Sequence, residues 1–319
     1  MENVEQIRKL DLAQIPAGTI KKYRYHIISD GLGSAINVPI IIAKGAEEGP
    51  ILGLTAAMHG NELNGIPVIQ RIFRNINPSK LKGTIIGVPV LNVPGFLRRS
   101  RKFNDDFDLN KKMPGRKNGN RSDVYAFRIF EEIIKQFNYL IDLHTASSGR
   151  TNSYYIRADL QDPLIKKLAL LQNAEIVLDN KGSKGTLRKA AAEHNIPAIT
   201  VELGDPHRFQ KDIIKASIAG IQNTLKFLKM IQGNKERSKK KPIICKDSYW
   251  MYTESGGVLA VMVKLTEKVK KDQIIARVRD IFGEVIEEYK APEDGVIIGR
   301  SVDPVNQTGS RIIHLGLFE

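Results

Sequence analysis

Residues 51–65 read ILGLTAAMHGNELNG, and the fold is best derived from this stretch outward. The continuous apolar run 51–57 predicts a buried strand, and a helical pattern begins near Ile66. His59 and Glu62 therefore stand where a strand ends and a helix begins, and their spacing lets both side chains reach one metal ion. The plainer alternative is a polar turn that caps the helix, and only the rest of the chain can separate the two.

Length and composition describe an ordinary globular protein. The chain has 319 residues, of which 42% are hydrophobic and 26% charged, enough for one large domain or two. No run approaches the roughly 20 apolar residues that span a bilayer, and the acidic N-terminus has no apolar segment, so neither a membrane span nor a signal peptide is expected. Cys245 is the only cysteine, which excludes an intrachain disulfide and favours a reducing, cytoplasmic setting.

The net charge of +14 raises the question of nucleic acid as a partner. The lysines are spread along the chain apart from residues 235–241, aromatic residues make up only 7%, and no nucleic-acid motif is recognisable. A lysine-rich solvated surface explains the charge better, so nucleic acid is not expected as a partner.

Strands and helices alternate along residues 18–231, which predicts an α/β layer fold. The segment 91–121 is dense in Pro, Gly, Asn, Asp and Arg, and we expect it to be a long functional loop. Predicted strands lie within 18–44 and at 51–57, 84–90, 139–143 and 198–203, and predicted helices at 66–76, 124–137, 164–172, 187–194 and 211–231.

The composition changes at residues 233–242, a polar run closed by Pro242 that predicts an interdomain linker. The linker would divide the chain into a catalytic α/β domain, 1–232, and a small all-β domain, 243–319. Short alternating segments without a helical pattern follow it. The strands expected there are 257–263, 273–279, 283–289, 295–300 and 311–317.

Polar groups that a core does not need stand at three predicted strand ends: His59 with Glu62, then His144, then Glu202. Ligands bind at the carboxyl ends of strands in open α/β sheets, so these groups are expected to meet. Two histidines and a carboxylate are a common catalytic zinc set with a fourth position open to water, which predicts one Zn²⁺ per chain. Glu202 would then be the base that takes the proton of the water.

The predicted loop 91–121 supplies charged and polar side chains that could bind a substrate beside a metal ion. Residues 98–102 and 108–112 contain several cations and an amide, which could clamp a carboxylate and polarise a scissile carbonyl. A basic loop that is merely solvated has the same composition, and the metal motif is what favours the functional interpretation.

Six motifs follow one another in order across residues 50–205. They are His59-Gly60-Asn61-Glu62, Asn92-Val93-Pro94-Gly95-Phe96, Arg101 followed by Asp108-Leu109-Asn110, Pro114-Gly115, Asp142-Leu143-His144-Thr145 and Val201-Glu202-Leu203-Gly204. In these motifs the chain resembles the succinylglutamate desuccinylase/aspartoacylase family, a branch of the zinc carboxypeptidase superfamily.

The resemblance implies a zinc-carboxypeptidase-like mixed sheet flanked by helices, with zinc on His59, Glu62 and His144 and with Glu202 as general base. It also implies that Asp108 fixes the tautomer of His59, and that Arg101 and Asn110 hold the substrate. The family usually has Arg where this chain has Lys111, which keeps the charge but loses the bidentate fork. Either Lys111 or Lys112 contacts the substrate differently, or the substrate is not the usual one.

The C-terminal part resembles the barrel-sandwich domain of biotinyl and lipoyl carriers at 269–273 and 291–295. The turn 280–283 lacks the carrier lysine, so we expect an unmodified module that walls the mouth of the active site or mediates assembly, including a possible homo-oligomer.

The sequence thus predicts a zinc-dependent amidohydrolase that cleaves the amide bond of a small anionic N-acyl amino acid or related compound. The zinc or Arg101 would stabilise the oxyanion, and Glu202 would protonate the departing amine. Two alternatives stay open: a zinc carboxypeptidase acting on peptides, and a non-catalytic binder of acidic metabolites or nucleic acid. The set of His59, Glu62, His144 and Glu202 argues against the binder, which needs no metal, open position and base together.

Overall fold

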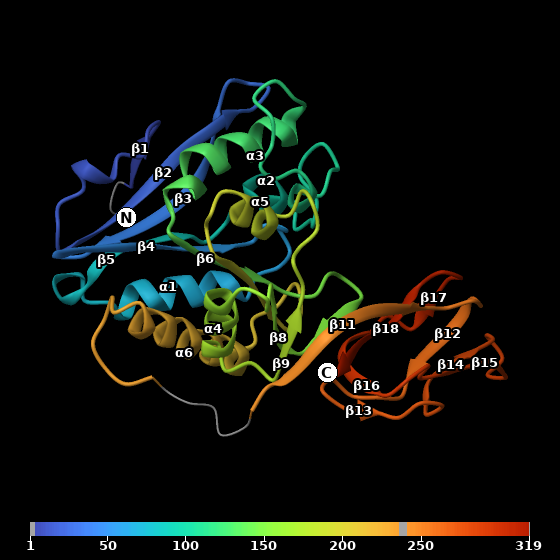
Figure 1. The fold of residues 1–319 in the computed structure, drawn as a ribbon. Coiled ribbons are helices and arrows are strands. Elements are labelled where there is room, and N and C mark those ends of the chain that lie inside the picture. The colour runs from blue at the N-terminus through green and yellow to red at the C-terminus, as the bar shows by residue number, and fades with distance from the viewer. Residues whose placement is uncertain (1–3, 236–240, 319) are drawn as a thin grey trace.

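One long mixed sheet runs through the protein (Figure 1). The computed structural model describes residues 4–235 and 241–318, so residues 236–240 of the predicted linker lie outside the described part. The main sheet has the strand order β1-β2-β3-β5-β4-β6-β10-β8-β9-β11-β18-β16-β13.

The strands that carry the site are parallel neighbours at the middle of this order. They are β4 (Glu47–Ala56), β5 (Lys82–Val88), β6 (Tyr139–His144) and β10 (Ala198–Leu203), whose carboxyl ends all lie at the same edge. Their inner positions are buried on both faces, which is why they read as continuous apolar runs and not as alternating ones. The outer strands β1 (Glu5–Ile7), β2 (Thr19–Ser29) and β3 (Ala35–Lys44) continue the sheet beyond β5.

Helices cover both faces of this sheet (Figure 1). On one face, α1 (Gly65–Asn75), α4 (Pro163–Leu171) and α6 (Lys211–Phe227) pack their apolar stripes against β4, β6 and β10. On the other face, α3 (Arg121–Glu132) and α5 (Leu187–Glu193) form a second core with β2 and β3. None of the helices in residues 4–235 and 241–318 is long and apolar enough to cross a membrane.

The mixed α/β architecture is confirmed, but the segment 91–121 is not the uninterrupted loop that the sequence predicts. It contains α2 (Val93–Leu97) and the 3₁₀ helix η3 (Leu109–Lys111). The side chains of Asn92 and Asp108 accept hydrogen bonds from the first-turn amides of these helices, which stabilises turns too short to show a periodic pattern. The helix predicted over 124–137 ends at Glu132, and a separate 3₁₀ helix, η4 (Ile134–Gln136), follows it.

Four strands next to the site are not predicted from the sequence. They are β7 (Arg150–Asn152), β8 (Tyr154–Ala158), β9 (Ile176–Asp179) and β11 (Ile243–Tyr252). β9 lies between β8 and β11, and β11 pairs with the distant β18. Because long-range pairing and not local alternation forms these strands, a window of sequence gives little sign of them.

The C-terminal strands continue the main sheet and add a smaller one. β11 lies parallel to β9, and β18 (Arg311–Phe318), β16 (Gly295–Ser301) and β13 (Lys268–Val269) follow it in the same sheet. A second sheet has the order β15 (Val285–Lys290), β14 (Ile274–Arg279), β12 (Gly257–Val261) and β17 (Val305–Asn306). Backbone hydrogen bonds therefore connect the C-terminal strands to the strands that carry the site.

Candidate metal centre and active site

The turn after β4 places the first two functional side chains. Ala57 has a φ of 49°, which ends the strand, and the backbone then closes a turn in which the amide of Glu62 donates to the carbonyl of His59 at 3.0 Å. Gly60 passes against Gly95 so closely that a Cβ there would overlap the Gly95 carbonyl. The glycine lets this turn lie under α2, and His59 and Glu62 consequently point to one place.

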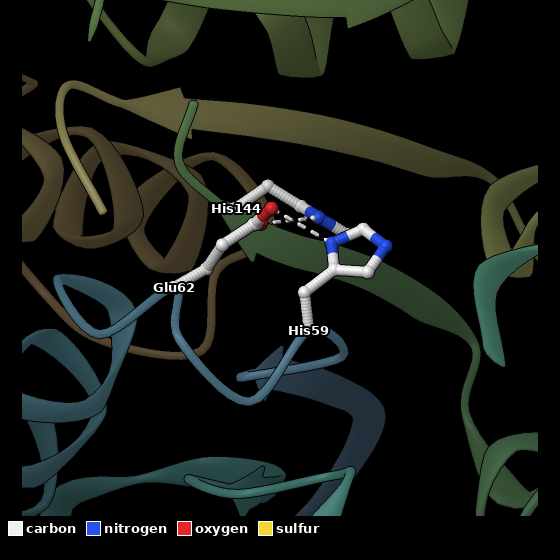
Figure 2. A group of neighbouring side chains, drawn as sticks. All are labelled: His59, Glu62 and His144. Carbon is white, nitrogen blue, oxygen red and sulfur yellow. Dashed lines mark hydrogen bonds and ion pairs between the residues drawn. The ribbon is translucent and has the colours of Figure 1, made fainter. Parts of the chain in front are cut away.

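His144, the last residue of β6, completes a buried group with His59 and Glu62, as Figure 2 shows. His59 Nδ1 lies 2.9 Å from Glu62 Oε1, and His144 Nδ1 lies 3.1 Å from Glu62 Oε2. The candidate ligand atoms all lie within 4.8 Å of one another, and the exposed fractions are 2%, 1% and 4% for His59, Glu62 and His144. The three residues converge as predicted.

The opposite ring nitrogens of both histidines are held by carboxylates. His59 Nε2 lies 3.0 Å from Asp108 Oδ1, and His144 Nε2 lies 2.7 Å from Asp142 Oδ2. Asp142 is in turn fixed by the Thr55 hydroxyl, which donates to its Oδ1 at 2.6 Å. A carboxylate that accepts the Nε2 proton leaves Nδ1 with a lone pair, the arrangement that a metal-ligating histidine needs.

The local charges fit a cation at this place. Burial alone would raise the pKa of Glu62, but His59 and His144 hold it well below its ordinary value, so the carboxylate is ionised. Burial would lower the pKa of His144, and Asp142 and Glu62 outweigh it and raise that pKa. Without a metal these carboxylates therefore stabilise a proton on Nδ1, the place that a metal ion would take. The Nδ1 atom of His59 is buried without a hydrogen-bond partner among the described residues, although a carboxylate oxygen is near. A buried nitrogen of this kind beside a carboxylate suits a metal ion better than a hydrogen bond.

Arg101 lies at the rim of this group. Its Nε and one terminal nitrogen donate to Asp108 Oδ2 at 3.2 and 3.0 Å, and the other terminal nitrogen donates to Glu62 Oε1 at 2.8 Å and to the Ser147 hydroxyl at 2.6 Å. Together with His59, Arg101 offsets the burial of Asp108 and holds the pKa of this carboxyl well below its usual range. The guanidinium therefore fixes two carboxylates, that of Asp108 behind His59 and that of Glu62 within the candidate metal site.

Glu202 stands in register with His144, on the neighbouring strand β10, and is 8% exposed. Asn152 Nδ2 donates to its Oε2 at 3.2 Å, and Arg157 Nε lies 3.4 Å from its Oε1. Burial raises the pKa of Glu202, against the opposing effect of Arg157. A Cβ on Gly299 of β16 would lie 2.5 Å from Asn152 Oδ1, so that glycine leaves room for the amide that holds Glu202.

Asn110 and Lys111, both of η3, also line the site. Asn110 Oδ1 accepts a hydrogen bond from the Leu187 amide at 2.8 Å, which ties η3 to the start of α5. Lys111 is exposed and lines the cavity, as does Arg188, which donates to Asn180 Oδ1 at 2.6 Å. Burial, and then the charge of Arg157, lower the pKa of Arg188 to about 10.

These side chains enclose a cavity of about 360 Å³. The cavity also holds groups that sequence reasoning missed. The contact between Asp142 and His144 could have been predicted from the sequence, because residues two apart on a strand point to the same face. The rest carry no motif. Arg188 lies on the predicted helix α5, and strands whose pairing is long-range bring in the others, which are Arg150, Asn152, Arg157, Trp250 and Arg311.

Comparison with known proteins identifies the family of this chain. The model of the succinylglutamate desuccinylase/aspartoacylase catalytic domain matches residues 48–228. An N-α-acetyl-L-2,4-diaminobutyric acid deacetylase of Halomonas elongata is 26% identical over 283 residues, which cover 83% of this chain and 81% of that protein. A succinylglutamate desuccinylase of Pseudomonas paraeruginosa is 27% identical over 228 residues, 67% of this chain and 66% of that protein.

Solved structures share the fold over nearly the whole chain. The product-bound ectoine utilization protein EutE (DoeB) of Ruegeria pomeroyi superposes with a TM-score of 0.87 at 21% identity, covering 95% of this chain and 98% of that one. A succinylglutamate desuccinylase/aspartoacylase of Rhodobacter sphaeroides has the same TM-score at 19% identity, covering 97% and 98%. With the catalytic-domain model matched over more than half of its length, the chain belongs to the succinylglutamate desuccinylase/aspartoacylase family.

Proposed function

We propose that this protein is a zinc-dependent amidohydrolase that removes the acyl group from a small N-acyl amino acid or related compound. The observation that carries the proposal is the convergence of His59 Nδ1, His144 Nδ1 and the Glu62 carboxylate in a cavity that also holds the buried Glu202. The names of two relatives support the reaction type, since one is a deacetylase and the other a desuccinylase.

His59, Glu62 and His144 would hold one zinc ion, and Asp108 and Asp142 would keep both rings in the tautomer that ligates through Nδ1. When bound, zinc supplies a Lewis acid that polarises the scissile carbonyl and lowers the pKa of water. Side chains of the cavity would carry out the other steps of the proposed reaction.

Glu202 is the proposed general base. Its carboxylate takes a proton from the attacking water as the new C–O bond forms, and returns it to the nitrogen of the departing amine as the C–N bond breaks. Burial raises its pKa towards the range in which a carboxyl can both accept and donate a proton. Asn152 and Arg157 hold the carboxylate in one orientation, so that the proton transfers occur at a fixed atom.

Arg101, Asn110 and Lys111 are the proposed substrate-binding residues. Arg101 is placed beside Glu62 to donate to the carbonyl oxygen as negative charge develops there. Lys111 attracts a carboxylate as a point charge from the cavity wall, whereas an arginine would grip it with two parallel hydrogen bonds. Asn110 uses its oxygen to hold α5, which leaves its amide nitrogen for the substrate.

We further propose that residues 1–232 form the catalytic unit and that residues 243–319 form a barrel-sandwich-like unit that walls the cavity. The single cysteine supports a reducing cytoplasmic setting. We propose that the C-terminal unit also mediates a homo-oligomer. A cavity of about 360 Å³ suits a small molecule, and this favours a deacylase over a carboxypeptidase acting on peptides.

The test is a hydrolysis screen of the purified protein with N-acetyl and N-succinyl amino acids and N-acyl diamines, together with metal analysis. We expect about one zinc per chain, and we expect Glu202→Gln to abolish hydrolysis while the zinc stays bound. A protein that binds no zinc after supplementation, or a Glu202→Gln variant that remains active, would refute the proposal.

A further inference from the structure

Two arginines lie against one tryptophan at the C-terminal wall of the cavity. The guanidinium carbons of Arg150 and Arg311 each lie 5.3 Å from the ring centre of Trp250, and all three residues line the cavity. Trp250 belongs to β11, Arg311 to β18 and Arg150 to β7. His314 stacks on the indole at 5.0 Å between ring centres with an interplanar angle of 10°, and this fixes the tryptophan in place.

These two cations line the cavity, and no carboxylate among the described residues lies within ion-pair distance of either one. Among the described residues, neither Arg150 nor Arg311 forms an ion pair, whereas Arg101 and Arg157 in the same cavity both do. Burial, followed by the charges of Arg311 and Arg101, lowers the pKa of Arg150, so Arg150 and Arg311 repel each other. Burial and the surrounding arginines also hold the pKa of His314 well below its usual value, so His314 is neutral and adds no charge. An anion between the two guanidinium groups would relieve this repulsion.

We propose that Arg150 and Arg311 form an anion subsite that binds a carboxylate of the substrate remote from the scissile amide, with Trp250 holding both guanidinium groups at the cavity wall. The inference rests on the proposed function, because it names a part of the same substrate. Guanidinium groups bind carboxylates through charge-assisted hydrogen bonds, and the face of Trp250 keeps both groups oriented.

The proposed subsite and the proposed reaction centre come in part from different segments of the chain. The match to the family's catalytic domain ends at residue 228, before Trp250 and Arg311, and the proposed metal ligands and base all lie within it. The wall that selects the substrate is therefore built in part from strands outside the matched domain.

The experiment measures a preference ratio in the zinc-loaded full chain. One substrate pair varies the acyl end, with an N-succinyl amino acid against its N-succinamoyl analogue, which replaces the terminal carboxylate by an isosteric amide. A second pair varies the amine end, with an N-acetyl amino acid against its α-carboxamide. For each pair the ratio of kcat/KM for the acid over the amide is determined in the parent protein and in Arg311→Gln.

We expect Arg311→Gln to lower one of the two ratios by about 10- to 100-fold, which corresponds to one charge-assisted hydrogen bond. The pair that responds identifies the end of the substrate that the subsite binds. Arg311 is exposed, so its replacement should leave the fold intact. The matched control is Lys246→Gln, which removes one positive charge from an exposed position of β11 that does not line the cavity.

The subsite is refuted if both ratios in Arg311→Gln equal those of the parent, or if Lys246→Gln lowers them equally. A fall in both substrates of a pair with an unchanged ratio also refutes it, because a structural defect does not distinguish an acid from its amide. Failure of the proposed function gives a different result, namely that the parent protein hydrolyses none of the four compounds.

Discussion

Replacing Gly299 by alanine tests how the proposed base is held. The new Cβ would lie 2.5 Å from Asn152 Oδ1, whereas ordinary contact begins at 3.4 Å, so the amide must move by about 1 Å. Asn152 Nδ2 lies 3.2 Å from Glu202 Oε2, and a displacement of that size breaks the hydrogen bond. A hydrogen bond to a charged group contributes about 1.5–3 kcal/mol, so kcat/KM should fall by about 10- to 100-fold near neutral pH.

The Gly299→Ala substitution should also change the pH dependence of kcat/KM in a defined direction. The Asn152 amide donates a hydrogen bond to the ionised form of Glu202. Loss of this bond makes the ionised form less stable and raises the pKa of Glu202, in addition to the increase that burial causes. A base works only when deprotonated, and the acidic limb of the kcat/KM profile should therefore move to higher pH. The defect should be largest on the acidic side and diminish as the pH rises beyond the shifted pKa.

The assay is a kcat/KM profile across pH for a substrate found in the screen, with metal content and Tm measured in parallel. Asn152→Ala should reproduce the shift, and the double variant should be no worse than either single one, because both act through one contact. Gly256→Ala is the control, since its Cβ would meet its neighbours at 3.5 Å or more. A Gly299→Ala protein that folds, binds zinc and keeps the parent profile would refute the reasoning.

Three further predictions concern the candidate metal site formed by His59, Glu62 and His144. Asp142→Asn should weaken zinc binding about 10- to 100-fold in a chelator competition, because His144 loses the carboxylate that orients its ring; equal affinity would contradict that role. Gly60→Ala should lower the free energy of unfolding by about 1–3 kcal/mol, since its Cβ has no space beside Gly95. Gly31→Ala, which has no neighbour within 4 Å, is its control in the same denaturation experiment. Removal of zinc by a chelator should lower Tm, because the ion binds only the folded protein, and an unchanged Tm would argue against a metal there.

The parallel strands and the residues at their ends could be predicted from the sequence, since both depend on local pattern. The apolar run before His59 gives β4, and the alternation in Asp142-Leu143-His144 gives a strand with two polar groups on one face. The cavity wall could not be predicted in this way. Trp250 lies in β11, which local alternation does not predict, and Arg311 begins the predicted strand 311–317. Only the pairing of β9 with β11 and of β11 with β18 brings both residues to the cavity that His59, Glu62 and His144 line.

The pairing of β7 with β16 affects the order in which the parts of the proposed active site are completed during synthesis. β7 carries Asn152, which touches Glu202, and its backbone partner is the Gly299 region, translated about 150 residues later. The proposed metal ligands, His59, Glu62 and His144, are all present once β6 has paired with β4, well before those residues are synthesised. In the proposed function, a growing chain could therefore bind its metal ion early, whereas the proposed base, Glu202, would be aligned only after the last strands have added to the sheet. The C-terminal strands would thus set the moment at which the proposed hydrolysis can begin.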